Sequence, residues 1–187
     1  MKVYIKALVA AIVVGGIFAG LFSYWRSKTQ SHEGIQKLST LDKMETKGIP
    51  TFTANDLKGN LFNLDSLKDS VVIVNFWASW CGPCVEEVPS LVSLVGAMKG
   101  KLKLVAVSGD NTKEDINAFL KAFPKMKGDN ITIILDEDRS ISRLYNVDRF
   151  PESFVAGKNL ILAKKIVGSI PWHTKESEAY ISELLAK

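Results

Sequence analysis

A nearly continuous apolar run that leads directly into the chain's only two cysteines constrains this fold more than any other feature. Val71–Trp77 is built almost entirely of β-branched and aromatic residues, which is typical of a central strand buried on both faces of a sheet. The stretch from about Cys84 to Met98 that follows has the spacing of a helix. A strand followed by a helix that begins at the thiols predicts an α/β fold with Cys81 at a helix amino terminus.

The two cysteines are separated only by Gly82 and Pro83. Such a pair can close into a small disulfide and reopen, which makes a two-electron redox centre. The dipole and free N–H groups of a helix amino terminus favour the thiolate of Cys81, and the thiolate is the species that attacks disulfides. A permanent structural disulfide across so short a loop adds little stability.

Metal binding is the other ordinary use of two cysteines. A structural zinc ion needs four ligands, and the two histidines, His32 and His173, do not complete a zinc-finger spacing. We therefore expect redox chemistry and no metal site.

Further strands and helices alternate along the chain. A hairpin is predicted from Phe52 to Leu64 around the turn Lys58-Gly59-Asn60, and a strand–helix unit between Leu102 and Phe123. The remaining predicted elements are strands at Ile131–Leu135, Ser153–Ala156 and Leu160–Val167, a short helix through Ile141 and Tyr145, and a last helix capped by Thr174. This order predicts a mixed central sheet flanked by helices.

The amino terminus has the pattern of a membrane segment. Lys2 and Lys6 precede Ala7 to Trp25, which contains no charged residue and as a helix would span about 28 Å. We predict a transmembrane helix within residues 1–26, a polar linker at 27–48 and a folded domain at 49–187. A cleaved signal peptide is the alternative. Positive charges flank both sides of the segment, so they do not decide its orientation.

The net charge of +4 comes from 24 basic and 20 acidic residues. The lysines are dispersed and form no basic stripe with interleaved aromatic residues, so we do not expect a nucleic-acid partner. Two cysteines are also too few for a disulfide-stapled secreted scaffold.

The segment Trp77-Ala78-Ser79-Trp80-Cys81-Gly82-Pro83-Cys84, preceded by Val74-Asn75-Phe76, resembles the thioredoxin superfamily. The stretch from Gly48 to Leu185 is similar to the membrane-tethered TlpA/ResA-like thiol-disulfide oxidoreductases. Three further features carry this narrower resemblance, namely the amino-terminal segment, the sequence Glu87-Val88-Pro89 and the sequence Phe150-Pro151. The resemblance implies a thioredoxin-like fold and an enzyme without a cofactor. It also implies a domain facing the periplasm or an equivalent extracytoplasmic space, a disulfide-containing protein substrate and a membrane-embedded electron donor.

The resemblance also assigns roles to residues. It implies that Cys81 is the exposed nucleophile and Cys84 the buried resolving thiol, and that the two form the redox-active disulfide. It implies that Pro151 is a cis-proline beside the thiols, with an ordinary turn proline as the alternative. It makes Glu87 a carboxylate that manages the thiol protons, the alternative being a surface acid. The other expected active-site neighbours are Trp80, which should shield the disulfide, Gly82, Pro83 and Phe150.

Two positions depart from the family pattern. Thioredoxins carry a buried Asp where Asn75 stands, and an amide cannot exchange a proton, so Glu87 or solvent must accept the proton of the resolving thiol. Glu152 follows the proline where the family commonly has Thr. Phe150 and Glu152 are therefore expected to alter substrate preference.

The Gly-Pro dipeptide favours the reducing end of the redox range, because thioredoxin with this motif has a potential of about −270 mV. We therefore expect reduction of protein disulfides, with apocytochrome c before haem attachment as one candidate substrate. A disulfide oxidase or isomerase is the alternative within redox chemistry. A copper-delivery protein that uses the cysteine pair and a distant histidine is disfavoured by the cysteine spacing, and His173 is expected on the surface or at a helix cap. A peroxidase is disfavoured because no lone cysteine in a Thr-rich loop occurs.

Overall fold

The computed structural model describes residues 15–26, 28 and 40–187, and the chain divides into two compact units, Met1–Asp42 and Lys43–Lys187. In the first unit, residues 15–26 are helical. Among the described residues, no helix has both the length and the apolar character needed to cross a bilayer. Residues 7–14 of the predicted transmembrane helix, and most of the predicted linker, lie outside the described part of the chain.

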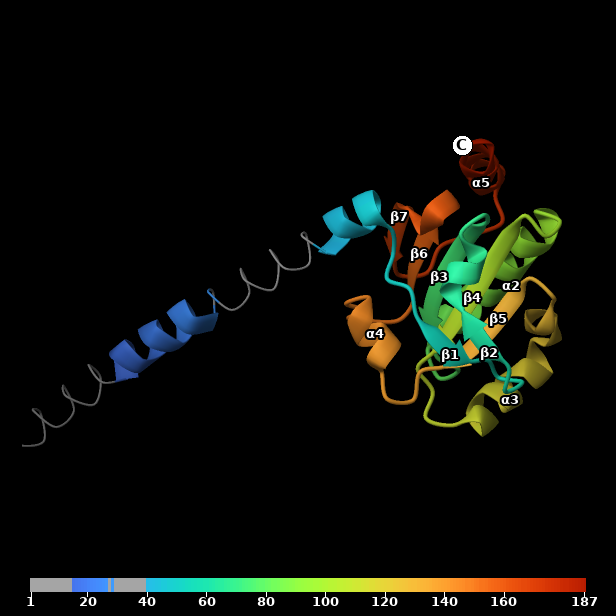
Figure 1. Ribbon diagram of the computed structural model, residues 1–187. Coiled ribbons are helices and arrows are strands. Elements are labelled where there is room, and N and C mark those ends of the chain that lie inside the picture. Colours follow the sequence, from blue (N-terminus) through green and yellow to red (C-terminus); the bar gives the residue numbers. More distant parts are fainter. Residues whose placement is uncertain (1–14, 27, 29–39) are drawn as a thin grey trace, which may run out of the picture. The chain divides into compact units, whose positions relative to one another are not determined.

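The second unit is built on a five-stranded sheet in the order β5-β4-β3-β6-β7 (Figure 1). Central β3 pairs in parallel with β4 and antiparallel with β6, so the predicted mixed sheet is confirmed. β4 pairs in parallel with β5, and β6 antiparallel with β7. The strands are β3 (Val71–Trp77), β4 (Leu102–Ser108), β5 (Ile131–Leu135), β6 (Glu152–Ala156) and β7 (Leu162–Val167).

All seven residues of β3 are buried, as its composition predicts. Its alternate side chains point to opposite faces of the sheet. Val71 and Ile73 belong to the main hydrophobic core with residues of the helices. Phe76 packs on the other face against Tyr145 and Phe154, with ring centroids 5.1 and 5.8 Å away. Asn75 and Trp77 therefore share the face of Val71 and Ile73.

The helices α2 to α5 surround this sheet (Figure 1). Residues 40–47, which include the boundary between the two units, are also helical. Residues of α2, α3 and α5 pack into the main core, whereas α4 leads into Tyr145 on the other face. The helices are α2 (Gly82–Ala97), α3 (Lys113–Ala122), α4 (Ser140–Leu144) and α5 (Lys175–Ala186), with short 3-10 turns η1 (Leu64–Leu67), η2 (Pro124–Lys127) and η3 (Lys158–Leu160).

The predicted hairpin is present as β1 (Thr53–Asn55) and β2 (Leu61–Asn63), an antiparallel pair. The predicted strand–helix unit is present as β4 and α3, and Thr112 caps α3 in a reciprocal capping box with Asp115. Several boundaries differ from the prediction by one or two residues, and β6 begins at Glu152 instead of Ser153. α2 begins at Gly82 because Cys81 caps it, and β7 begins at Leu162 because η3 occupies the residues before it.

Candidate active site

The two cysteines form a disulfide with a Cα–Cα distance of 5.3 Å, at the point where β3 has ended and α2 begins. Cys81 is the amino-terminal cap of α2, and its Sγ accepts the backbone N–H of Cys84 at 3.3 Å. The predicted position of Cys81 at the helix amino terminus is therefore confirmed. After reduction, the same N–H groups and the helix dipole stabilise a thiolate at Cys81.

The two cysteines differ in their exposure. Cys84 is fully buried, whereas Cys81 is 7% exposed and lines an open groove of about 600 Å³ together with Trp80, Gly82, Pro83 and Phe150. Trp80 stands at this groove with 66% of its surface exposed, and its ring lies 6.0 Å from that of Phe150. Cys81 is thus accessible from the groove, whereas Cys84 is shielded from it.

The Phe150–Pro151 peptide bond is cis, the geometry that the resemblance implies. Phe150 lines the same groove as Cys81, which places this loop beside the disulfide. The carbonyl of Pro151 accepts the N–H of Gly168 at 2.9 Å, which ties the loop to the end of β7.

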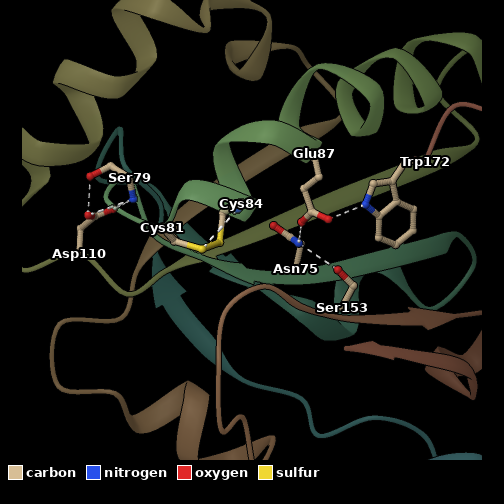
Figure 2. Close-up of a disulfide and its surroundings, with 8 residues drawn as sticks. All are labelled: Asn75, Ser79, Cys81, Cys84, Glu87, Asp110, Ser153 and Trp172. Carbon is tan, nitrogen blue, oxygen red and sulfur yellow. Dashed lines mark hydrogen bonds between the residues drawn. A yellow bond between two sulfur atoms is a disulfide. The ribbon is translucent and has the colours of Figure 1, made fainter. Parts of the chain in front are cut away.

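A buried polar cluster lies on the other side of the disulfide (Figure 2). The Glu87 carboxylate, 3% exposed, accepts hydrogen bonds from Asn75 Nδ2 at 2.9 Å and Trp172 Nε1 at 3.1 Å. Asn75 Nδ2 also donates to Ser153 Oγ at 2.9 Å. Cys84 and Glu87 are three residues apart on α2 and so share one helix face. Glu87 is thus not a surface acid.

Burial raises the pKa of Glu87 above its ordinary value, against the opposing effect of hydrogen bonds from Trp172, Asn75 and the backbone of Ile170. A carboxyl with a raised pKa, on the helix face that also bears the buried Cys84, is suited to exchange protons with the thiol of that residue. Glu86, the preceding residue, is exposed and has no part in the cluster.

A second polar cluster fixes the loop before Cys81 (Figure 2). The buried carboxylate of Asp110 accepts the Ser79 N–H at 3.1 Å, the Ser79 hydroxyl at 2.7 Å and the Ser108 hydroxyl at 2.6 Å. These bonds attach the loop that carries Trp80 and Cys81 to the end of β4. This role of Asp110 was not predicted from the sequence.

The structure corrects the expectation for Glu152. Its side chain is buried and its Oε2 lies 2.7 Å from Lys165 Nζ on β7, although this contact does not have hydrogen-bond geometry. Glu152 does not line the groove beside the disulfide. Glu152 lies opposite Phe76 in the β3–β6 pairing, and its buried side chain contributes nothing to the groove surface beside Cys81.

The contributions of Trp172 and Ser153 to the buried polar cluster were also not predicted from the sequence. Ser153 lies directly opposite Asn75 in the β3–β6 pairing. The available signal was a polar side chain in each of two otherwise apolar strands, but only the strand register brings them together. Trp172 arrives from the segment before α5 and gave no local signal.

No metal-binding group emerges in the described part of the chain, where no three side chains of His, Cys, Asp or Glu converge. His173 lies just before the Thr174 cap of α5, and its Nε2 is 3.0 Å from Glu178 Oε1 on the surface.

A cysteine pair that caps the helix after the central strand of a mixed sheet, with a cis-proline loop beside it, defines a thiol-disulfide oxidoreductase with a thioredoxin-like fold. The chain belongs to the Redoxin family, whose model matches residues 44–181.

Named relatives agree with this class. The thiol-disulfide oxidoreductase ResA of Bacillus cereus (strain ZK / E33L) is 31% identical over 146 residues, which cover 76% of this chain and 80% of the relative. ResA of Bacillus subtilis (strain 168) is 29% identical over 127 residues, 67% of this chain and 69% of the relative. A candidate thiol:disulfide interchange protein DsbE from Chlorobium tepidum, known from its crystal structure, is 30% identical with a TM-score of 0.64, over 74% of this chain and 97% of that one.

Proposed function

We propose that this enzyme reduces disulfides of partner proteins, with Cys81 as the attacking thiolate and Cys84 as the resolving thiol. The observation that carries the proposal is that only Cys81 lines the open groove, while Cys84 is buried behind it.

The proposed reaction has two displacement steps. The Cys81 thiolate attacks one sulfur of the partner disulfide, forms a mixed disulfide and releases the other partner sulfur as a thiolate. The Cys84 thiolate then attacks Cys81 Sγ, closes the Cys81–Cys84 disulfide and releases the second partner thiolate. Two electrons pass from the dithiol to the partner. A dithiol of a membrane-embedded donor protein returns them by the reverse exchange.

In this proposal Glu87 accepts the proton that Cys84 must lose before it can attack. Asn75 cannot take that proton, because an amide is too weak a base to hold one at neutral pH. It instead donates to Glu87 and to Ser153, and so fixes the carboxylate beside the helix face that bears Cys84. The proposed role of Pro151, with Phe150, Trp80, Gly82 and Pro83, is to shape the surface that meets the partner next to Cys81.

The reducing direction is supported by the Gly82-Pro83 dipeptide, which thioredoxin shares. The similarity to ResA proteins supports thiol-disulfide exchange. The family resemblance adds cytochrome c maturation as the proposed setting, with apocytochrome c thiols as the product of the reduction.

The proposed location is extracytoplasmic, with the domain at 49–187 tethered through the linker at 27–48 to a membrane anchor within 1–26. The uncharged stretch from Ala7 to Trp25 supports the membrane anchor. The family resemblance supports the extracytoplasmic side. Alkaline extraction of membranes from cells that express the full chain tests the anchor, and the intact mass of the recovered protein tests cleavage. Recovery of a shortened protein in the soluble fraction would identify a cleaved signal peptide.

The function is tested by the reduction potential of Cys81–Cys84 in the full chain in detergent, equilibrated with defined ratios of reduced and oxidised dithiothreitol. We expect a value near that of thioredoxin, about −270 mV. A value above about −150 mV contradicts the reductase proposal and indicates an oxidase. Pre-reduced protein should also reduce insulin disulfides, and Cys81→Ser should abolish this reaction.

A further inference from the structure

The groove beside the disulfide carries an unusual charge. Three of its lining side chains are arginines, Arg139, Arg143 and Arg149, and one is a carboxylate, Asp148. The arginines come from α4 and its flanking loops, and from the segment that leads into the cis-proline. Basic side chains thus exceed acidic ones beside the sulfur that meets a partner.

Arg139 is fixed at one end of this groove. Its guanidinium donates to the carbonyl of Gly109 and lies with its central carbon 5.3 Å from the ring centroid of Phe150. A Cβ at Gly109 would come within 2.6 Å of both the guanidinium carbon of Arg139 and the Phe150 ring. Gly109 therefore leaves the space in which the guanidinium stacks on the ring.

Arg143 and Arg149 are exposed and extend the positive charge along the groove. Arg143 Nη1 donates to the backbone carbonyl of Asp138 at 2.7 Å. Hydrogen bonds from Ser140 and, as a smaller effect, the charge of Arg143 lower the pKa of the Asp138 carboxyl. Asp148 is the one acidic residue among those that line the groove, so three arginines stand against one carboxylate there. The groove lining therefore carries more positive than negative charge.

We propose that this groove binds an acidic polypeptide segment that flanks the substrate cysteine, so that the enzyme selects disulfides with Asp or Glu nearby. The inference rests on the proposed function and specifies its substrate class. Guanidinium groups pair carboxylates in a bidentate geometry. A positive groove also raises the rate of encounter with an acidic partner. Trp80 and Phe150 add aromatic surface next to Cys81 for the apolar residues of the bound segment.

The test compares pre-reduced full-length enzyme on two peptides that share one disulfide loop and differ only in their flanks, acidic in one and basic in the other. Uncharged bis(2-hydroxyethyl) disulfide is the reference substrate. We expect the acidic peptide to be reduced about tenfold faster than the basic one at low salt. The preference should shrink as salt screens the charges.

The charge-reversed variant Arg143→Glu/Arg149→Glu should lose or invert the ratio of the two peptide rates. The matched control Lys125→Glu/Lys127→Glu changes the net charge equally at two exposed positions on η2, outside the groove. It should keep the wild-type ratio.

Equal rates for the two peptides, or an equal change of the ratio in both double variants, would overturn the proposal. Faster reduction of glutathione disulfide than of the acidic peptide would also overturn it, because the groove would then serve a small anionic disulfide. Failure of the proposed function has a different signature, since the wild-type enzyme would then leave bis(2-hydroxyethyl) disulfide unreduced.

Discussion

The two sides of the Cys81–Cys84 disulfide are built in opposite ways. Behind Cys84, the charged group is buried and saturated with partners, since Glu87 accepts bonds from Asn75 and Trp172. In front of Cys81, Arg143 and Arg149 are exposed and line the groove.

This contrast separates two tasks at one redox centre. A buried, fully bonded carboxyl has a perturbed affinity for protons and is inaccessible to a partner, so it suits control of the resolving thiol. An open groove lined by exposed guanidinium groups suits recognition of a partner. Helix α2 makes the separation possible, because its cap Cys81 faces the groove while Cys84 and Glu87 lie on its buried face.

The largest expected effect comes from a second acid on the buried side. Asn75→Asp places two carboxyl groups in contact and removes the donor to Glu87, so the oxidised protein should lose about 3 kcal/mol of unfolding free energy at about pH 8. At about pH 5 the loss should be smaller, because one carboxyl then holds a proton and donates to the other. Urea denaturation at both pH values measures this.

The double variant Asn75→Asp/Glu87→Gln is the control for that prediction. This variant again pairs one carboxyl group with one neutral amide, so much of the lost free energy of unfolding should return. A loss of equal size at the two pH values, or no recovery in the double variant, would contradict the account of the buried cluster.

A smaller loss is expected when the indole donor is removed. Trp172→Phe deletes the bond to Glu87 Oε2 and should cost about 2 kcal/mol of unfolding free energy. It should also raise the pKa of Glu87 further, since that bond stabilises the carboxylate. Carboxyl carbon NMR through a pH titration follows this pKa.

Trp77→Phe provides the matched comparison. Trp77 is buried in the same core, but its indole N–H has no hydrogen-bond partner among the residues described. The substitution should lower stability through packing and leave the pKa of Glu87 unchanged. Equal pKa shifts in the two variants would show that the Trp172 bond does not control Glu87.

The raised pKa of Glu87 also predicts a pH dependence of stability. The folded state keeps the Glu87 proton to a higher pH than the unfolded chain does, so it binds more protons between the two values. The free energy of unfolding should therefore fall as the pH rises from the ordinary value of 4.5 through the raised folded value. The difference between wild type and Glu87→Gln across a series of pH values isolates this effect. Glu86→Gln, at the exposed neighbour, should not alter the curve.

The smallest expected effect concerns the groove in front of Cys81 and changes the rate of reduction without changing stability. Raising the salt concentration from about 50 mM to about 500 mM should slow reduction of an acidic peptide severalfold. Reduction of uncharged bis(2-hydroxyethyl) disulfide should be unaffected over the same range. An equal response of both substrates in stopped-flow measurements would remove the electrostatic difference between the two sides.

The sequence predicted the local features of this site but not the contacts between residues far apart along the chain. The strand Val71–Trp77 and the helix after it could be predicted because their signals are local, an apolar β-branched run and helical spacing. Cys81, Cys84 and Pro151 followed from a motif and a resemblance. The partners of Glu87 could not be predicted, because Trp172 lies 85 residues away along the chain and Ser153 meets Asn75 only through strand register. Glu152 was misjudged because the sequence does not show which way its side chain points.

Trapping of the mixed disulfide tests the central claim most directly. Pre-reduced full-length Cys84→Ser and Cys81→Ser variants are incubated with insulin, and the adducts are mapped by mass spectrometry without reduction. The account predicts that Cys84→Ser accumulates a covalent adduct through Cys81, while Cys81→Ser forms none. An adduct through Cys84 in the Cys81→Ser variant, with none in Cys84→Ser, would contradict the assignment of the groove side to attack and the buried side to resolution.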